Sequence, residues 1–144
     1  LFPKNFVYCL NTPSNYIGVS SIFKEDGAHV AQIVDLEDAS QIFPEKHTKH
    51  LAVDSLPKSM EQAIATFLLS CAIRDLRGES LKHRSMLINV SRFTDVQGRL
   101  AETLKAYLYG LVEEVKQYLA DSELWFRHES LVQLKAQFDE QYSD

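Results

Sequence analysis

The stretch from Ser85 to Leu119 constrains the fold of this chain more than any other, because its hydrophobic period changes in the middle. Residues 86–90 (MLINV) form a short apolar run with β-branched side chains, which predicts a buried strand. From Val96 onward, apolar residues recur at every third or fourth position, which predicts an amphipathic helix of about six turns. The sequence therefore predicts a strand, a polar elbow and a long helix.

The polar elbow contains Ser91, Arg92 and Thr94. We expect Thr94 to cap the helix, with Gln97 at the capping-box position. A helix that starts at the end of a buried strand directs unpaired N–H groups and the positive end of its dipole toward solvent, where phosphate can bind. The elbow is therefore a candidate contact for a nucleic-acid backbone. The alternative is that both hydroxyls only satisfy backbone groups and that Arg92 is only solvated, as in most such turns.

Composition limits the protein classes to which this chain can belong. It has 144 residues, of which 45% are apolar and 24% are charged, so we expect one soluble globular domain with a real core. The net charge of −5 excludes a global basic field, and any contact with nucleic acid must be local. No apolar run approaches the length of a membrane span, so we expect no membrane partner. Cys9 and Cys71 form no spaced pair, which favours a reducing, cytoplasmic location.

Two other helices are expected. The stretch from Pro57 to Arg77 has an apolar face wide enough to pack on two sides, and Gly78 is a natural helix stop. We expect this helix to form the centre of the core. A last helix runs to Phe138 and begins either near Ser122 or near His128.

Short strands are expected at residues 6–10 and 29–34 in addition to residues 86–90. The predicted fold class is therefore α/β and predominantly helical. We expect residues 1–144 to form a single domain, with a strand- and loop-rich segment at 1–54 and a helical core at 55–144. Because the sequence begins at Leu1, we also expect it to be an excerpt of a longer protein.

No motif for catalysis or metal binding stands out. The chain has no glycine-rich phosphate loop and no nucleophile elbow, so we expect no catalytic residues within it. His47 and His50 lie three positions apart among lysines, but a metal site needs a third ligand. We interpret them as part of a surface loop, and the carboxylates of Asp35, Glu37 and Asp38 as a solvated rim.

Three blocks of sequence resemble a known family. FPKNFVYCLNTPSNYIGVSSIF, LPKSMEQAIATFLLSCAIRDLRG and SMLINVSRFTDVQGRL occur in this order between residues 2 and 100. Together they resemble the Z1 (Z-one) domain of bacterial proteins associated with restriction and DNA modification, which are often described as endonucleases. The resemblance extends from about Leu1 to Leu119.

The resemblance implies a position inside a superfamily-two, helicase-like ATPase. LINVSRFTDV is similar to motif IV of such proteins, which opens the second RecA-like lobe with a strand, a polar step and a helix. The remaining residues would then include a helical insert. By this resemblance Ser91 and Arg92 lie on the step that touches the DNA backbone, with Thr94 at the helix start. ATP and Mg²⁺ would be bound outside these residues, and the remaining domains of the parent protein would be partners.

Two functional hypotheses follow. In the first, the chain is a non-catalytic segment that links helicase-like lobes and contacts DNA weakly through its backbone. In the second, it is a helical module for protein–protein interaction or oligomerisation. The location of charge and of apolar surface distinguishes the two. One face carrying Arg84, Arg92, Arg99 and Lys105 would favour DNA, and an exposed patch of Trp125, Phe126 and Phe138 would favour a protein partner.

Overall fold

The structure is a computed structural model, and it describes residues 17–30, 33–34, 36–118 and 124–142. The chain divides into two units, Leu1–Asp35 and Leu36–Asp144. In the first unit, α1 (Val19–Phe23) is followed by a tight turn. A Cβ atom at Gly27 would lie 2.5 Å from the backbone oxygen of Ser21, so this turn requires glycine.

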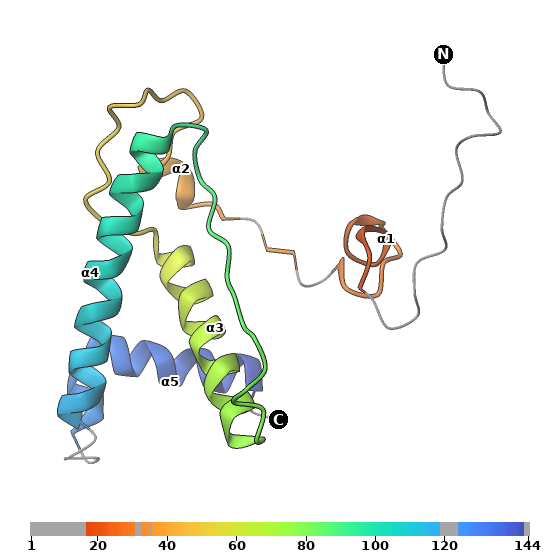
Figure 1. The fold of residues 1–144 in the computed structure, drawn as a ribbon, viewed down its shortest axis with the longest axis vertical. Helices are drawn as coiled ribbons and strands as arrows, with labels where there is room; N and C mark the ends of the chain where they lie inside the picture. The colour runs from red at the N-terminus through yellow and green to blue at the C-terminus, as the bar shows by residue number, and fades with distance from the viewer. Residues whose placement is uncertain (1–16, 31–32, 35, 119–123, 143–144) are drawn as a thin grey trace. The chain divides into compact units, whose positions relative to one another are not determined.

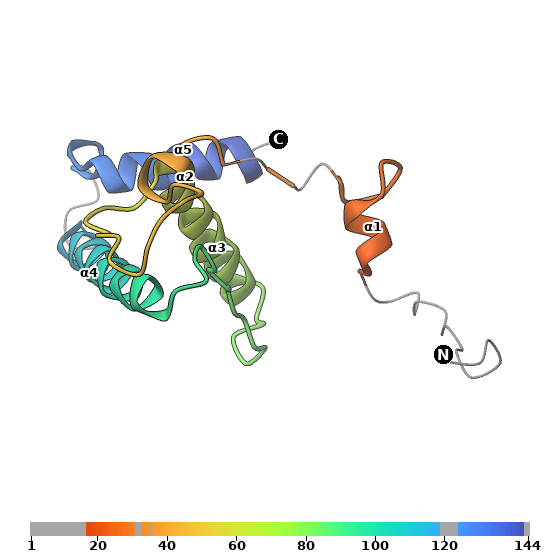
Figure 2. The same cartoon turned by 90° about the horizontal axis from the view of Figure 1, so that it is seen from above.

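The second unit is built from helices. They are α2 (Ala39–Ile42), α3 (Lys58–Leu76), α4 (Thr94–Tyr118), the 3-10 turn η3 (Trp125–Arg127) and α5 (Glu129–Tyr142). Helices α3 and α4 diverge from each other, and α5 packs against both, beside Glu61 and Ala65 in the first half of α3 and beside Tyr107 of α4 (Figures 1 and 2). The connection from α3 to α4 runs back from the C-terminal end of α3 to the start of α4 (Figure 1).

The predicted α/β fold class is wrong, because the described residues contain helices and no strand. Residues 86–90 are extended, but no other part of the described chain pairs with them. The start of a RecA-like lobe is therefore not supported. The described part of the predicted strand at 29–34 is not a strand either, since Val30 lies in a 3-10 turn. The predicted strand at 6–10 lies outside the described residues.

Helix α3 confirms the prediction for the stretch from Pro57 to Arg77. Pro57 is its N-cap residue, and Gly78 follows its end with a φ of +77°, which glycine adopts without strain. Pro57 supplies no side-chain cap, and Asp38 takes this role from 21 residues away. Its carboxylate accepts the backbone N–H of Ser59 at 2.9 Å and also the Ser59 hydroxyl, and these bonds lower the pKa of Asp38. Asp38 therefore caps α3, although it lies 21 residues before Ser59 in the sequence.

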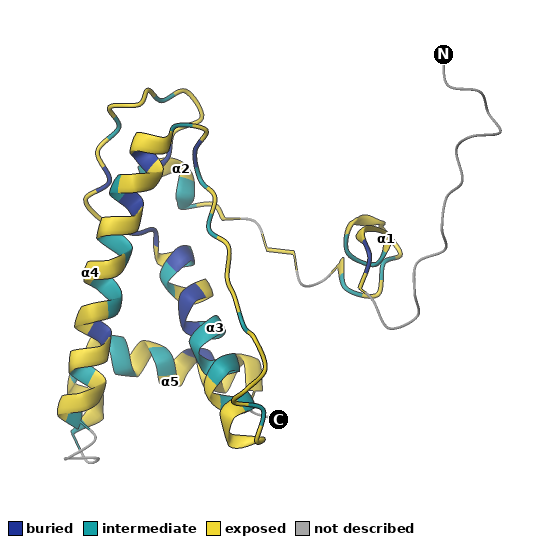
Figure 3. Ribbon diagram, in the orientation of Figure 1, coloured by how far each residue is buried: buried dark blue, intermediate teal, exposed yellow. Residues whose placement is uncertain are grey.

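The core lies at one end of the second unit, where the starts of α3 and α4 meet the preceding loop (Figure 3). Its buried residues are Phe43, Val53, Leu56, Met60, Ile64, Val96 and Leu100. The first half of α3 packs on two sides, against the core through Met60 and Ile64 and against α5 beside Ala65, whereas Leu76 near its end is 88% exposed. None of the described helices is long and apolar enough to cross a membrane.

Candidate functional site

Ser91, the first residue of the predicted DNA-backbone contact, instead connects the segment before α4 to other parts of the protein. Its side chain is buried, and its hydroxyl lies 2.8 Å from Nε2 of His47 and accepts the N–H of Phe93 at 3.1 Å. Nδ1 of His47 lies 2.6 Å from the carbonyl of Pro44, which can only accept. In the neutral imidazole, Nδ1 therefore donates to Pro44 and Nε2 accepts from Ser91. The Ser91 hydroxyl therefore donates one hydrogen bond and accepts another within the protein.

Thr94 is the first helical residue of α4, not its N-cap. The carbonyl of Phe93 accepts the first helical bond, from the N–H of Gln97 at 3.1 Å. The Gln97 side chain does reach back, as a capping-box residue would, but it donates to the carbonyl of Ser91 and to Oδ1 of Asn89. The predicted capping box is therefore wrong, because the Gln97 side chain donates to acceptors on Asn89 and Ser91 and accepts no backbone N–H of Thr94.

Arg92 and Thr94 lie two positions apart at the start of α4, and both are exposed. The Arg92 guanidinium carbon lies 4.9 Å from the centre of the Phe93 ring, a cation–π contact that leaves its N–H groups open to solvent. Asp95 places a carboxylate in the same first turn, which weakens the attraction of this end for phosphate. Of the three predicted contact residues, two are accessible and one is not.

The other cations proposed to accompany Arg92 are used within the protein. Lys105 pairs with Glu102 at 2.9 Å. Arg99 donates from Nε to the carbonyl of Leu51 at 2.9 Å and also binds the carbonyl of Lys49. These cations and Arg84 therefore do not form a free basic face with Arg92.

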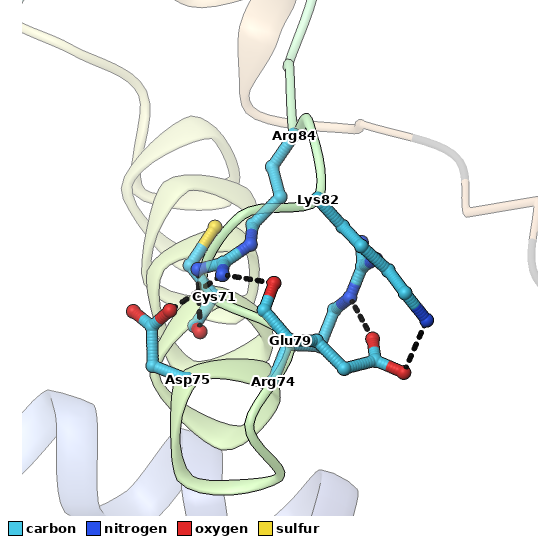
Figure 4. A network of polar contacts seen from close by, with 6 residues as sticks. All are labelled: Cys71, Arg74, Asp75, Glu79, Lys82 and Arg84. Carbon is cyan, nitrogen blue, oxygen red and sulfur yellow. Dashed lines mark hydrogen bonds and ion pairs between the residues drawn. The ribbon is translucent and has the colours of Figure 1, made fainter.

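Arg84 joins the extended segment to the C-terminal end of α3 (Figure 4). It binds the carboxylate of Asp75 and the carbonyls of Cys71 and Glu79, and only 13% of its side chain is exposed. The contact with Asp75 lowers the pKa of that carboxyl and raises the pKa of Arg84. Glu79 lies beside this joint and pairs with Lys82 and Arg74, which lower its pKa to about 2.

A groove beside the first turns of α4 is acidic. It has a volume of about 530 Å³ and is lined by Asp54, Asp95 and Glu102, together with Arg99, whose guanidinium is held by carbonyls. Such a surface repels a nucleic-acid backbone. The described residues contain no group of three His, Cys, Asp or Glu side chains that could hold a metal ion, and both nitrogens of His47 are already bonded.

An apolar groove lies between the diverging halves of α3 and α4. It has a volume of about 280 Å³ and is lined by Leu68, Leu69, Ala72, Leu111, Val112, Val115, Lys116 and Leu134. Val112 and Val115 are 47% and 38% exposed, although they continue the apolar stripe by which the first half of α4 enters the core. Leu134 of α5 lines the groove together with residues of α3 and α4.

The predicted aromatic patch is partly exposed. Trp125, Phe126 and Phe138 are 38%, 58% and 36% exposed, and the rings of Trp125 and Phe126 meet edge to face with centres 6.4 Å apart.

The sequence did not identify Asp38 and His47 as contact residues. Asp38 binds Ser59, which is 21 positions away, and His47 binds Ser91, which is 44 positions away. No local pattern in the sequence signals such pairs.

These features define a helical domain in which most of the polar side chains described above bind other groups of the same chain. The profile of the Z1 domain family matches residues 59–144, which is more than half of the chain. The chain therefore belongs to the Z1 domain family. The match begins at α3 and includes α5, whereas the resemblance was expected between residues 1 and 119. Membership is compatible with a domain of a larger defence protein. No curated protein and no solved structure matches the chain.

Proposed function

We propose that this chain is a non-catalytic, helical docking segment of a larger ATP-dependent, DNA-acting restriction or defence protein. The parent protein would bind ATP and Mg²⁺ outside these residues and would act as a helicase-like ATPase or endonuclease. Its family membership supports this setting. The role of the segment would be to hold another part of the same parent protein against the apolar groove of α3, α4 and α5.

The observation that carries the docking role is the chemistry of this groove. Seven of its eight lining residues are apolar, and the eighth, Lys116, pairs with Glu113 at 2.9 Å. Apolar side chains that line a concave surface gain free energy when a complementary apolar surface displaces water from it. A nucleic-acid backbone cannot supply that surface. We therefore propose an apolar segment of the parent protein as the occupant.

Cysteine labelling tests this proposal. In a background in which Cys9 and Cys71 are replaced by alanine, Val115→Cys places a thiol in the groove, and Ala106→Cys places one on another exposed face of α4. We expect a maleimide to label both thiols readily in the 144-residue chain. In the parent protein, labelling at position 115 should slow by about tenfold or more, with little change at position 106. Equal rates at position 115 in both proteins, or an equal fall at both positions, would exclude the groove as the docking site.

A second candidate function is contact with the DNA backbone through Arg92 and Thr94. The observation that favours it is the exposure of both side chains at the start of the longest helix. Ser91 is no longer a suitable contact, because its hydroxyl is buried and bonded to His47 and Phe93. Any such contact would be weak, since only one free guanidinium contributes to it.

Arg127 provides a matched control for this second candidate. Like Arg92, it is exposed and lies over the ring of a neighbouring phenylalanine, with 5.9 Å between the guanidinium carbon and the ring centre. DNA binding by the 144-residue chain should be measured by fluorescence anisotropy over a range of salt concentrations. Arg92→Ala should weaken binding and reduce the salt slope by about 1, whereas Arg127→Ala should do neither. Absence of binding at low salt, or equal effects of the two changes, would refute the contact.

A further inference from the structure

A small cavity lies between α3, α4 and α5, and Glu61 of α3 lines it. Its volume is about 20 Å³, which is room for about one water molecule. Tyr107 lines it from α4, and Ser130, Leu134 and the buried Gln137 line it from α5. Helix α5 therefore packs on α3 at a point where α3 carries an ionisable side chain.

The carboxylate of Glu61 has little to compensate for its burial. The residue is partly buried, and among the described residues neither a hydrogen bond nor an ion pair is recorded for its carboxylate. Lys58, on the same helix, attracts it, whereas Asp38 and Glu129 repel it. A carboxylate that gives up hydration without gaining a partner destabilises the packing around it for as long as it is charged.

Acidic groups also face this position from α4. Burial raises the pKa of the Tyr107 hydroxyl, and the carboxylates of Glu61 and Glu114 raise it further. One carboxylate oxygen of Glu114 is itself buried without a hydrogen-bond partner among the described residues. Glu61 is therefore surrounded by acidic groups of α4, of α5 through Glu129, and of the residue that caps α3, with Lys58 as the basic group that acts on it.

These surroundings favour the neutral form of Glu61. Burial raises the pKa of Glu61 above the ordinary value of 4.5, Lys58 opposes the rise, and Glu129 and Asp38 add to it. The pKa of Asp38 is lowered instead, mainly because Ser59 binds its carboxylate. As the pH falls, Glu61 therefore binds a proton while Asp38 is still charged.

We propose that Glu61 is a proton-sensitive switch for α5: the neutral carboxyl lets α5 pack firmly on α3, and the carboxylate loosens this packing. Leu134 connects the switch to the apolar groove, because it lines both the cavity beside Glu61 and the groove. Loosening of α5 therefore withdraws the part of the groove wall that α5 supplies. This regulation of docking rests on the proposed function, whereas the switch itself is a property of the 144-residue chain alone.

Amide hydrogen exchange of the 144-residue chain, read by NMR and expressed as protection factors, tests the switch. Exchange is measured from pH 7 to pH 4 for the wild type and for Glu61→Gln, whose side-chain amide stays neutral and has nearly the shape of the acid. An acid with a raised pKa stabilises the folded state at low pH, and this contribution is lost as the pH rises above 4.5 and through the raised pKa. At pH 7 the amides of residues 133–137 in α5 should therefore be at least about threefold better protected in Glu61→Gln than in the wild type. The ratio should fall toward 1 as the pH is lowered.

Glu140→Gln is the matched control, because it removes a carboxylate from α5 at an exposed position outside the cavity. Its protection relative to the wild type should change little with pH. Equal protection of Glu61→Gln and the wild type at pH 7, a ratio that does not change with pH, or the same pH dependence in Glu140→Gln would overturn the proposal. So would wild-type α5 amides no less protected at pH 7 than those of residues 100–104 in α4, because α5 would then not open separately. The parent protein is absent from this experiment, so the labelling result at position 115 can fail without affecting it.

Discussion

Ser91→Ala is expected to lower the stability of the protein by about 1–3 kcal/mol, because it removes a buried hydroxyl and leaves two polar groups without their partner. These groups are Nε2 of His47 and the N–H of Phe93, which lie 2.8 Å and 3.1 Å from the Ser91 oxygen. The hydroxyl joins the loop before α3 to the segment before α4. Its loss should therefore weaken the whole second unit.

The assay is urea unfolding followed by circular dichroism at 222 nm. Ser85→Ala is the matched control, because Ser85 is exposed and no hydrogen bond is recorded for its hydroxyl within the described residues, so its effect should stay within about 0.5 kcal/mol. A double-mutant cycle with His47→Ala should give a coupling energy of about 0.5 kcal/mol or more. If Ser91→Ala were no more destabilising than Ser85→Ala, or if the effects of Ser91→Ala and His47→Ala were additive, Ser91 would not be a structural joint.

Three further predictions are tested by urea unfolding or by proteolysis. Leu100→Ala, at a side chain that is 4% exposed, should destabilise the protein by about 2–5 kcal/mol, whereas Leu87→Ala should have almost no effect on the free energy of unfolding. Glu79→Gln should lower stability at neutral pH, and the deficit should shrink as the pH falls from the ordinary glutamate pKa of 4.5 toward about 2. The reason is that the depressed pKa of Glu79 stabilises the folded state only where the carboxylate is ionised; a pH-independent deficit would contradict the ion pairs. Arg99→Met should accelerate proteolysis of the loop before α3, because the carbonyls of Lys49 and Leu51 lose their donor, and unchanged cleavage would show that the loop is held by other contacts.

The helices were predictable because their signals are local. Gly78 follows the end of α3 at the expected position, and the period of apolar residues predicted α4, which runs from Thr94 to Tyr118. The last helix begins at Glu129, in agreement with the second of the two predicted starts. Each of these boundaries depends on residues within one or two turns of it.

The strand predicted at residues 86–90 does not form, and no local signal in the sequence reveals this. Alternating burial is present, with Ile88 and Val90 against the core and Leu87 exposed, and this alternation is what the sequence pattern reports. A strand also needs a second extended chain to pair with, and the pattern carries no information about where that chain lies. This missing partner explains the error at residues 86–90, whereas at residues 29–34 the described residues include Val30 in a 3-10 turn.

The candidate site was only partly predictable for a related reason. Arg92 and Thr94 are exposed as expected, but the burial of Ser91 depends on His47, which is 44 residues away. The use of Arg99 as a donor to the carbonyls of Lys49 and Leu51 likewise involves residues about 50 positions apart. Charge in the sequence indicates a possible contact, and the fold decides whether the contact is internal.

The way in which α4 holds the preceding loop affects which substitutions this protein can tolerate. Arg99 and Thr103 bind the carbonyls of Lys49, Leu51 and Val53, so the joint depends on two particular side chains. A β-ladder would make the same connection through main-chain groups that every amino acid except proline supplies. In a saturation mutagenesis experiment, Arg99 and Thr103 should therefore be as restricted as core residues, although both are polar and lie near the surface. The carbonyl-bearing residues themselves should vary more freely wherever their side chains are exposed.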